Sequence, residues 1–364
     1  MILILARYLS EKKNEVIVVF GKRNSFLKKR LDEQNIEHIF YDEEEEFDYK
    51  SISGDDILVL FENYHGLKRF KRSKCRVLVW CILGPQIINW SNFDYKKVYK
   101  GKILRKKLDR SCLINLCKKN ALVCMDGSTQ GDVEAFIGKK MNIDIVPIPV
   151  ISAENYYIRK NMKEGKISIT YIGRGDVYWK VYPLKKILKD IKDINNHFIL
   201  NIFTSERELY DEVLEPILPD NVELVYQIGY YGMRLRTKLC EVSDLNISMG
   251  TAALESAVLG IPTIIVDAVT TNLPDDYRYR WIYQAEKYSL GYFDLHELPQ
   301  YEGYEMTDVV NTIMNKVERD CISGKCWEYV DMHHNIINTY MRLSRHEGYA
   351  SMRDIVKYSP NMWY

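Results

Sequence analysis

The strongest constraint on the fold is the alternation of short apolar runs with amphipathic stretches, which is typical of parallel strands joined by crossover helices. The first set of predicted strands covers 15–21, 36–41, 56–62, 76–82, 121–126 and 143–148. A polar stretch at 148–169 has weak periodicity and is predicted to be a linker. The pattern then restarts, with strands predicted at 167–173, 198–204, 222–228, 245–249 and 262–267. The sequence therefore predicts an α/β protein with two doubly wound units.

The domain boundaries follow from this repeat, and a length of 364 residues suits two domains. We predict a first Rossmann-like domain at 1–150, a second one at 151–325, and C-terminal helices at 326–364 that bridge them. Within Met1–Lys13 the apolar residues follow helical spacing, and too few residues precede strand 15–21 for a crossover connection. This segment is predicted to be a helix, and the strand that normally opens such a domain to be missing.

Composition and motifs exclude several classes of protein. The net charge is +1, from 51 Lys and Arg against 50 Asp and Glu, so the chain is no polycation and we expect no nucleic-acid partner. No apolar segment is long enough to span a membrane. The eight cysteines form no metal-binding spacing, which predicts reduced thiols, a cytoplasmic protein and no metal. The glycine motifs of dinucleotide dehydrogenases and P-loop enzymes are absent from the sequence.

The most informative segment is DLNISMGTAALESAVLGIP at 244–262. A strand leads into Gly250, which permits a tight turn, and Thr251 is predicted to cap a helix at 252–259. The N-terminus of that helix would offer unpaired N–H groups to an anion. Glu255 lies one turn further on, where a carboxylate suits a neutral diol such as ribose. The alternative is that Glu255 is an ordinary first-turn acid that complements the helix dipole.

A second segment, TYIGRGDVYWK at 170–180, places two cations after a strand. Gly173 ends the strand, and Arg174 and Lys180 are predicted to follow in a loop. Open α/β sheets bind ligands at the carboxyl ends of their strands. Together the two cations could neutralise a departing diphosphate without a metal. The alternative is that they are solvated loop charges.

These two segments together resemble the C-terminal half of GT-B glycosyltransferases, in particular family 4. The resemblance rests on the Gly-Arg…Lys element and on NISMGTAALESAVLGIPTII, and VELVYQIGYYG at 222–232 resembles the strand and loop that hold the nucleotide base. The first half of the chain is similar in outline only, through ARYLSEKKNEVIVVFG and IVPIPV. The resemblance implies a GT-B fold, with a cleft between two Rossmann-like domains and C-terminal helices that pack back. It also implies a nucleotide-diphosphate sugar as donor.

The resemblance further implies a donor site on the second domain. Arg174 and Lys180 would bind the diphosphate and stabilise the leaving group, and Glu255 would hold the ribose hydroxyls. The residues of this implied donor site are Gly173, Arg174, Lys180, Ile228, Gly229, Gly250, Thr251, Ala252 and Glu255. Among them, Ile228 and Gly229 would flank the base, and the segment 250–252 would supply turn and backbone contacts. Many retaining members carry two glutamates separated by seven residues, and the first of these positions is Ile247 here. Retention of configuration is therefore not predicted.

The first half offers no clear catalytic base. His65 and Asp126 follow predicted strands and are the two candidates, although polar residues at such places more often form turns or caps. Leu83-Gly84-Pro85 follows a third strand, where its backbone could approach a ligand or simply turn.

Basic residues concentrate in the first half, with 18 Lys and Arg against 5 Asp and Glu over 68–140. The runs at 68–76 and 96–110 could bind an anionic membrane surface, as acceptor domains of bacterial GT-B enzymes that extend lipid-linked saccharides often do. A solvated lysine-rich surface is the alternative. The acidic run at 42–48 is predicted to be a solvated loop.

The sequence thus predicts a metal-independent glycosyltransferase at the inner face of the plasma membrane. It would transfer a sugar from a nucleotide-diphosphate donor to a lipid-linked saccharide acceptor in surface-polysaccharide synthesis. Two alternatives stay open. A sugar-nucleotide 2-epimerase shares the architecture but needs further histidines and acids in the cleft. A non-catalytic relative that binds a nucleotide or a partner is favoured by the missing first strand and by Ile247.

Overall fold

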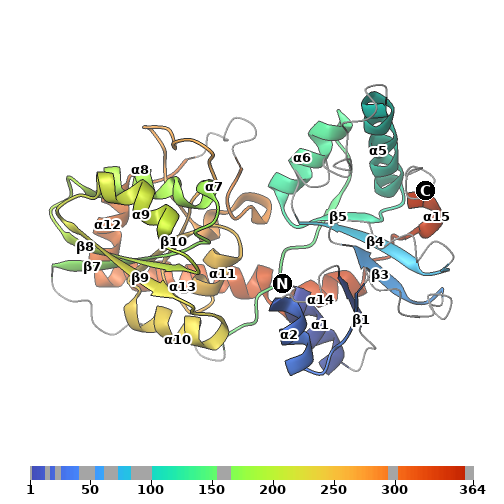
Figure 1. Ribbon diagram of the computed structural model, residues 1–364, viewed down its shortest axis with the longest axis horizontal. Coiled ribbons are helices and arrows are strands. Elements are labelled where there is room, and N and C mark those ends of the chain that lie inside the picture. The colour runs from blue at the N-terminus through green and yellow to red at the C-terminus, as the bar shows by residue number, and fades with distance from the viewer. Residues whose placement is uncertain are drawn as a thin grey trace. The chain divides into compact units, whose positions relative to one another are not determined.

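The computed structural model of the chain describes residues 2–12, 17–20, 26–40, 54–60, 73–82, 101–153, 165–293 and 302–356. These residues form two compact units, each with a parallel sheet and flanking helices (Figure 1). Unit 1 comprises Met1–Pro149 and Ile336–Tyr364, and unit 2 comprises Val150–Asn335. The chain thus returns to unit 1 after residue 335, whereas the predicted boundary at 325/326 falls inside a continuous helix, α13 (Lys316–His334).

Every strand predicted from the sequence is present. Unit 1 contains β1 (Ile17–Phe20), β2 (Glu37–Phe40), β3 (Ile57–Leu60), β4 (Arg76–Cys81), β5 (Leu122–Cys124), β6 (Asp144–Ile145) and the short β13 (Ala350–Ser351). Its helices are α1 (Ile2–Glu11), α2 (Phe26–Glu33), α5 (Gly101–Lys118), α6 (Gly127–Ile137), α14 (Ile336–Ser344) and α15 (Met352–Val356). The predicted N-terminal helix is therefore α1.

Unit 1 is built around strand β4, which is buried from Val77 to Cys81. It pairs in parallel with β3 and β5, and β13 joins it antiparallel, while β1 and β2 form a separate parallel pair. Trp80 is fully buried, and its indole Nε1 donates to the Val146 carbonyl at 2.9 Å. Leu5 of α1 and Ile336 of α14 pack in the same cluster as Trp80. The C-terminal helix α14 therefore packs back on the first helix of the chain.

Unit 2 contains the sheet that concerns function. Its strands are β7 (Lys166–Ile172), β8 (His197–Thr204), β9 (Val222–Ile228), β10 (Leu245–Ser248), β11 (Thr263–Ile265) and β12 (Arg280–Trp281). Its α-helices are α7 (Tyr178–Val181), α8 (Pro183–Ile191), α9 (Glu208–Leu214), α10 (Gly232–Val242), α11 (Thr251–Ala257), α12 (Met306–Met314) and α13. Short 3₁₀ turns are η4 (Glu215–Ile217), η5 (Ile282–Gln284) and η6 (Glu286–Tyr288).

The strand order in unit 2 is β12-β11-β10-β7-β8-β9, and all neighbours except β11 and β12 are parallel. The chain builds outward from β7 to β9 and then returns to place β10 on the other side of β7. This reversal of order is the topological switch point of a doubly wound sheet, where a crevice forms at the carboxyl ends of the two central strands. The strands β7 and β10 therefore mark the expected ligand site.

The two faces of this sheet differ in character. On one face, apolar side chains such as Ile169 and Ile202 pack against α8, α9 and α12. On the other face, Asn201, Thr170 and Asn246 stand in one row across β8, β7 and β10 and are buried. Figure 1 shows α10 on the side of the sheet opposite α8 and α9. A buried polar row of this kind is tolerated because its members bond to one another, as Thr170 Oγ1 does to Asn246 Oδ1 at 3.3 Å.

Asp126 lies at the start of α6 and is its N-cap. Its Oδ1 accepts a hydrogen bond from the backbone N–H of Thr129 at 2.7 Å, and the side chain is buried. Burial raises the pKa of the Asp126 carboxyl to about 6. The structure therefore gives Asp126 the capping role that the sequence offered as an alternative to a catalytic base.

We expect Asp126→Asn to be more stable than the wild type at pH 8. Because the folded pKa lies above the ordinary value near 3.9, the carboxyl favours folding when protonated, and this stability is lost as the pH rises through about 6. Asparagine caps a helix without charge, so the gain at pH 8 should be about 1–3 kcal/mol. Urea unfolding between pH 4.5 and 8 measures it.

Asp126→Ala is the matched control, because it removes the charge and the cap together and should therefore be about 1 kcal/mol less stable than Asp126→Asn at every pH. An asparagine variant that is less stable than the wild type at pH 8 would contradict the pKa assignment.

Candidate active site

Two loops flank the switch point of unit 2, at residues 173–177 after β7 and at 249–250 after β10. The backbones of the two strands pair at Ile169 with Leu245 and at Thr170 with Asn246. Beyond this pairing, Ser248 Oγ accepts a hydrogen bond from the Ile172 N–H at 3.1 Å. Both segments singled out from the sequence thus lie at the carboxyl ends of adjacent strands.

The loop after β7 is packed so tightly that it has no room for side chains at its two glycines. A Cβ at Gly173 would lie 2.6 Å from Tyr210 Oη and 2.7 Å from Tyr171 Cε1. A Cβ at Gly175 would collide with the backbone carbonyl of Glu206, which follows β8. The Gly-Arg-Gly sequence therefore fixes the path of the backbone that carries Arg174.

Arg174 and Lys180 come together beside this loop. Arg174 is exposed, with its Nε 3.6 Å from Asp176 Oδ1, and Lys180 is partly buried with its Nζ 4.8 Å from the centre of the Trp179 ring. Lys180 belongs to the short helix α7, which corrects the expectation of a loop. Burial, and to a smaller extent the charge of Arg174, lower the pKa of Lys180 to about 8. Within the described part of the chain, no carboxylate forms an ion pair with Lys180.

The turn after β10 departs from the prediction in one respect. Gly250, with φ 60°, is the residue that precedes α11, and its N–H donates to the Leu290 carbonyl at 2.7 Å. Thr251 is the first helical residue, its side chain makes no capping bond, and the helix ends at Ala257. The prediction that Thr251 caps a helix at 252–259 is therefore wrong. A positive φ suits glycine, so Gly250 takes the capping position instead.

Glu255 has a partner that the sequence did not reveal. The Nε of Arg236, on α10, donates to Glu255 Oε2 at 2.7 Å, and the two side chains are 11% and 26% exposed. The residues lie 19 positions apart and on different helices, so no spacing rule connects them. Ala252, on the same helix as Glu255, is partly buried.

The segment expected to flank a base lies at the end of β9. Ile228 is 49% exposed, although it is a large apolar residue. Gly229 follows with φ 75°, and its N–H donates to the Thr204 carbonyl at 3.4 Å. Ile247, at the position where many retaining enzymes carry a glutamate, is fully buried in the apolar core of unit 2.

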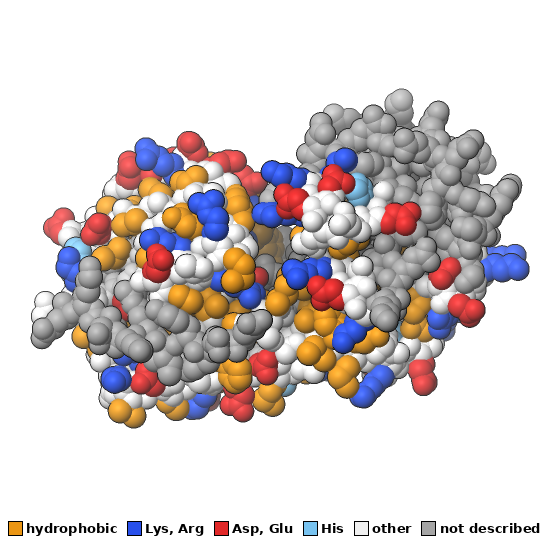
Figure 2. Space-filling model, turned by 90° about the horizontal axis from the view of Figure 1, so that it is seen from below, with side chains coloured by type: hydrophobic (Ala, Val, Ile, Leu, Met, Phe, Trp, Pro, Cys, Tyr) orange, Lys and Arg blue, Asp and Glu red, His pale blue; other side chains and the backbone are white. Residues whose placement is uncertain are grey.

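Several sequence candidates cannot be placed. His65, Leu83-Gly84-Pro85 and the acidic run 42–48 lie outside the described residues, as does most of the basic run 68–76. Helix α5 begins at Gly101, but the side chains of the basic run 96–110 are described only from Arg110. Over the surface drawn in colour in Figure 2, Lys and Arg side chains are interspersed with Asp and Glu. The membrane-binding runs stay a prediction.

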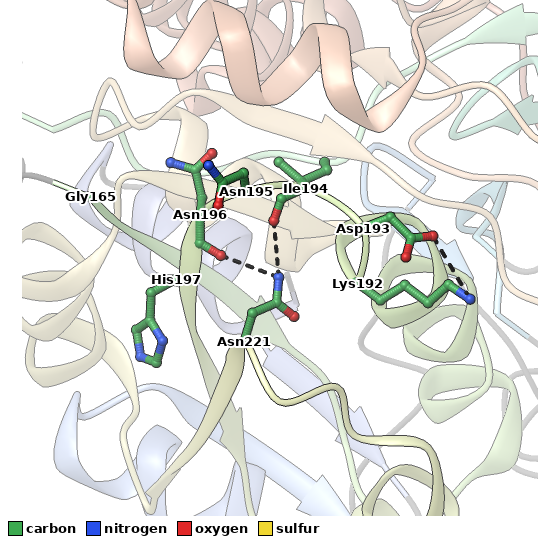
Figure 3. A pocket seen from close by; sticks show the side chains of 8 residues that line it. All are labelled: Gly165, Lys192, Asp193, Ile194, Asn195, Asn196, His197 and Asn221. Carbon is green, nitrogen blue, oxygen red and sulfur yellow. Dashed lines mark hydrogen bonds and ion pairs between the residues drawn. The ribbon is translucent and has the colours of Figure 1, made fainter.

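A hollow of about 560 Å³ opens at the opposite edge of the unit 2 sheet, where β7, β8 and β9 begin (Figure 3). One of its polar lining residues is Asn221, whose amide nitrogen donates to the carbonyls of Ile191, Ile194 and Asn196 at 3.0–3.2 Å. Asn221 thereby satisfies carbonyls at the end of α8, which is a structural task. This hollow contains none of the residues of the candidate site.

The described residues contain neither a metal-binding cluster nor a membrane-spanning helix. Among them, no three His, Cys, Asp or Glu side chains gather in a way that could hold a metal ion. In the same part of the chain, no helix has both the length and the apolar character that a bilayer-spanning segment needs.

Comparison with known proteins settles the fold. No protein-family model matches the chain, and no curated protein matches its sequence. A glycosyltransferase from Rickettsia africae ESF-5 superposes with a TM-score of 0.58 at 12% identity, covering 98% of this chain and 94% of that one. An alpha-glucosyltransferase in complex with UDP and a 13-mer DNA containing a HMU base superposes at 0.56 with 11% identity, covering 94% of each chain. The chain has the GT-B fold.

In this GT-B chain, we expect Gly175→Ala to displace the loop that carries Arg174. The new methyl group would meet the Glu206 backbone, which no side-chain rotation can relieve. Overpacking of this kind costs about 1–3 kcal/mol of stability. Chemical denaturation measures the loss of stability.

Gly131→Ala provides the control, because Gly131 lies inside α6 with nothing within 4 Å of its added methyl group. It should be neutral or stabilising, by up to about 1 kcal/mol. Equal effects of the two substitutions would contradict the steric account.

Proposed function

We propose that this protein is a glycosyltransferase that takes a sugar from a nucleoside-diphosphate donor. The observation that carries the proposal is the pair of cations at the switch point. Arg174 and Lys180 are close enough for the first charge to lower the pKa of the second, and no described carboxylate pairs with Lys180. Lys180, which is partly buried beside a second cation and has no carboxylate partner among the described residues, suits a polyanion such as a diphosphate.

In the proposed reaction, a hydroxyl oxygen of the acceptor forms a bond to the anomeric carbon of the donor sugar. The bond from that carbon to the diphosphate breaks, the electron pair leaves with the diphosphate, and the acceptor proton goes to a base. Negative charge therefore grows on the diphosphate as the reaction proceeds. Arg174 and Lys180 stabilise this charge, and their interaction is strongest where the charge is greatest.

The rest of the donor is assigned to the other residues around the same sheet edge. Glu255 accepts hydrogen bonds from the ribose hydroxyls. Gly250 forms the turn before α11, and Thr251 and Ala252 contact the phosphates through their backbone N–H groups. Ile228 and Gly229 flank the base, because an exposed apolar side chain beside a glycine offers a flat surface. This assignment is supported by the common location of these residues at the carboxyl ends of β7, β9 and β10.

For the acceptor, we propose a saccharide, in lipid-linked form, on the cytoplasmic side of the plasma membrane. The support is the concentration of Lys and Arg in the runs 68–76 and 96–110, which would attract anionic lipid. The proposed role is surface-polysaccharide synthesis. Because two side chains supply the positive charge, we propose that transfer needs no added divalent metal.

Thermal unfolding with UDP, GDP, CMP and dTDP tests the proposal first. A nucleotide present at 100 times its dissociation constant should stabilise the wild type by about 2.7 kcal/mol. Arg174→Ala and Glu255→Ala should each weaken binding by about 10–100-fold, the effect of a hydrogen bond to a charged group. Lys189→Ala is the control, since Lys189 forms an exposed ion pair with Asp275 away from the candidate residues.

No stabilisation by any of the four nucleotides would contradict the proposed function. If a nucleotide binds, product analysis separates the remaining alternatives. A transferase releases nucleoside diphosphate from the sugar nucleotide, an epimerase yields an isomeric sugar nucleotide, and a binding protein leaves the ligand unchanged.

We expect binding of the selected nucleoside diphosphate to weaken above about pH 8. Lys180 loses its proton near this pH in the free protein, and the bound diphosphate favours the protonated form. Binding above pH 8 should therefore take up a proton, which calorimetry in two buffers of different ionisation enthalpy detects.

Lys180→Arg provides the matched variant, because its charge persists at all these pH values. It should bind with little pH dependence between 7 and 9.5. If binding to this variant weakens above pH 8 as it does for the wild type, a group other than Lys180 titrates.

A further inference from the structure

We infer that Arg236 is a positioning residue, which holds the Glu255 carboxylate in the orientation that selects a ribose diol. This inference rests on the proposed function, because it presumes a nucleotide in the unit 2 site. It concerns a side chain on α10, outside the two segments from which the site was predicted.

The contact between Arg236 and Glu255 leaves half of the carboxylate available. Arg236 Nε donates to Oε2 at 2.7 Å, whereas no hydrogen bond from a described residue reaches Oε1. Both side chains are partly shielded from water, at 11% and 26% exposure, so the ion pair is less screened than one on an open surface. Glu255 is therefore oriented by one oxygen and able to accept hydrogen bonds through the other.

The location of α10 makes this contact more than a surface ion pair. The helix begins at Gly232, directly after the loop that starts at Gly229, and it buries Leu235 and Leu239. Arg236 lies one turn inside the helix and connects it to α11, which carries Glu255. By contrast, Lys238 pairs with Glu241 of the same helix, and that pair does not join α10 to another element.

The same contact also has a purely structural interpretation, in which Arg236 simply ties α10 to α11. The two interpretations differ in what they predict for selectivity. A structural tie would lower affinity for all nucleotides alike, whereas a positioning role affects only those with hydroxyl groups for Glu255 to bind. The ratio of affinities for a ribonucleotide and its dideoxy analogue therefore separates them.

The experiment is titration calorimetry with UDP against 2′,3′-dideoxy-UDP, and with GDP against 2′,3′-dideoxy-GDP, on the full chain. The wild type should bind the better of the two ribonucleotides at least about tenfold more tightly than its dideoxy form. Arg236→Ala should reduce this ratio to within about threefold of one and leave the dideoxy affinity nearly unchanged. Glu255→Gln should give the same reduction, and the double variant should show no further loss.

Lys238→Ala, on the same helix, is the matched control and should keep the wild-type ratio. Arg236→Lys retains the charge without the planar guanidinium, so its ratio should fall between those of the wild type and Arg236→Ala. If Arg236→Ala does not fold, Arg236→Lys decides: a ratio below that of the wild type supports the positioning role, and an unchanged ratio overturns it.

The outcomes distinguish the inference from the proposed function. If the wild type prefers the ribonucleotide and the Arg236 variant keeps the full ratio, the positioning role is overturned while the proposed function stands. If the wild type binds a nucleotide without preferring the ribose form, the role of Glu255 fails and that of Arg236 with it. If the wild type binds neither UDP nor GDP nor their analogues, the proposed function fails for these bases and the inference falls with it.

Discussion

The candidate site depends on how β7 and β10 are joined in the centre of the unit 2 sheet. Their backbones pair at two positions, and side chains complete the junction: Asp244 Oδ2 accepts from the Ser168 N–H at 2.8 Å, and Ser248 Oγ accepts from the Ile172 N–H. Buried backbone N–H groups need a partner, so these polar residues take over where the ladder ends. At the carboxyl end of the two strands, the Ser248 side chain takes the place of a further backbone hydrogen bond between them. The loops that follow β7 and β10 therefore lie on either side of the switch point.

The polar side chains of this junction also explain the difference between the two faces of the sheet. Asn201, Thr170 and Asn246 bond to their neighbours, so the face below α10 is held by directional bonds instead of apolar packing alone. Hydrogen bonds fix register and orientation, whereas apolar contact is largely non-directional. The helices α10 and α11 therefore pack on a sheet face whose directional hydrogen bonds fix their position. This matters if the Arg236–Glu255 contact between them is to orient a ligand.

Much of the fold could be predicted from the sequence because it is encoded locally. Continuous apolar runs identified the strands, and Gly175 and Gly250 are required by the backbone contacts or the φ angle of their own turns. The failures concern information that is not local. The chain returns to unit 1 only after Asn335, and the helix α13 runs without a break through the predicted boundary at 325/326. Arg236 contacts Glu255 through tertiary packing. Thr251 is not the cap because the positive φ of Gly250, which favours glycine, places the capping position one residue earlier.

The two cations of the site differ in how they are held, and this bears on what each contributes. Arg174 is 63% exposed and faces Asp176, which is itself 47% exposed, and such pairs contribute little to stability and exchange readily. Lys180 is fixed in α7, over the Trp179 ring, and Tyr171 donates a hydrogen bond to its backbone carbonyl. In the proposed site, Arg174 would have to leave Asp176 and reorient to meet a diphosphate, whereas Lys180 has no carboxylate partner to leave among the described residues. A group that need not reorganise gives its full interaction to charge that develops during the reaction. Within the proposed mechanism, Lys180 is thus the preorganised part of the leaving-group site, and Arg174 the part that responds to the ligand.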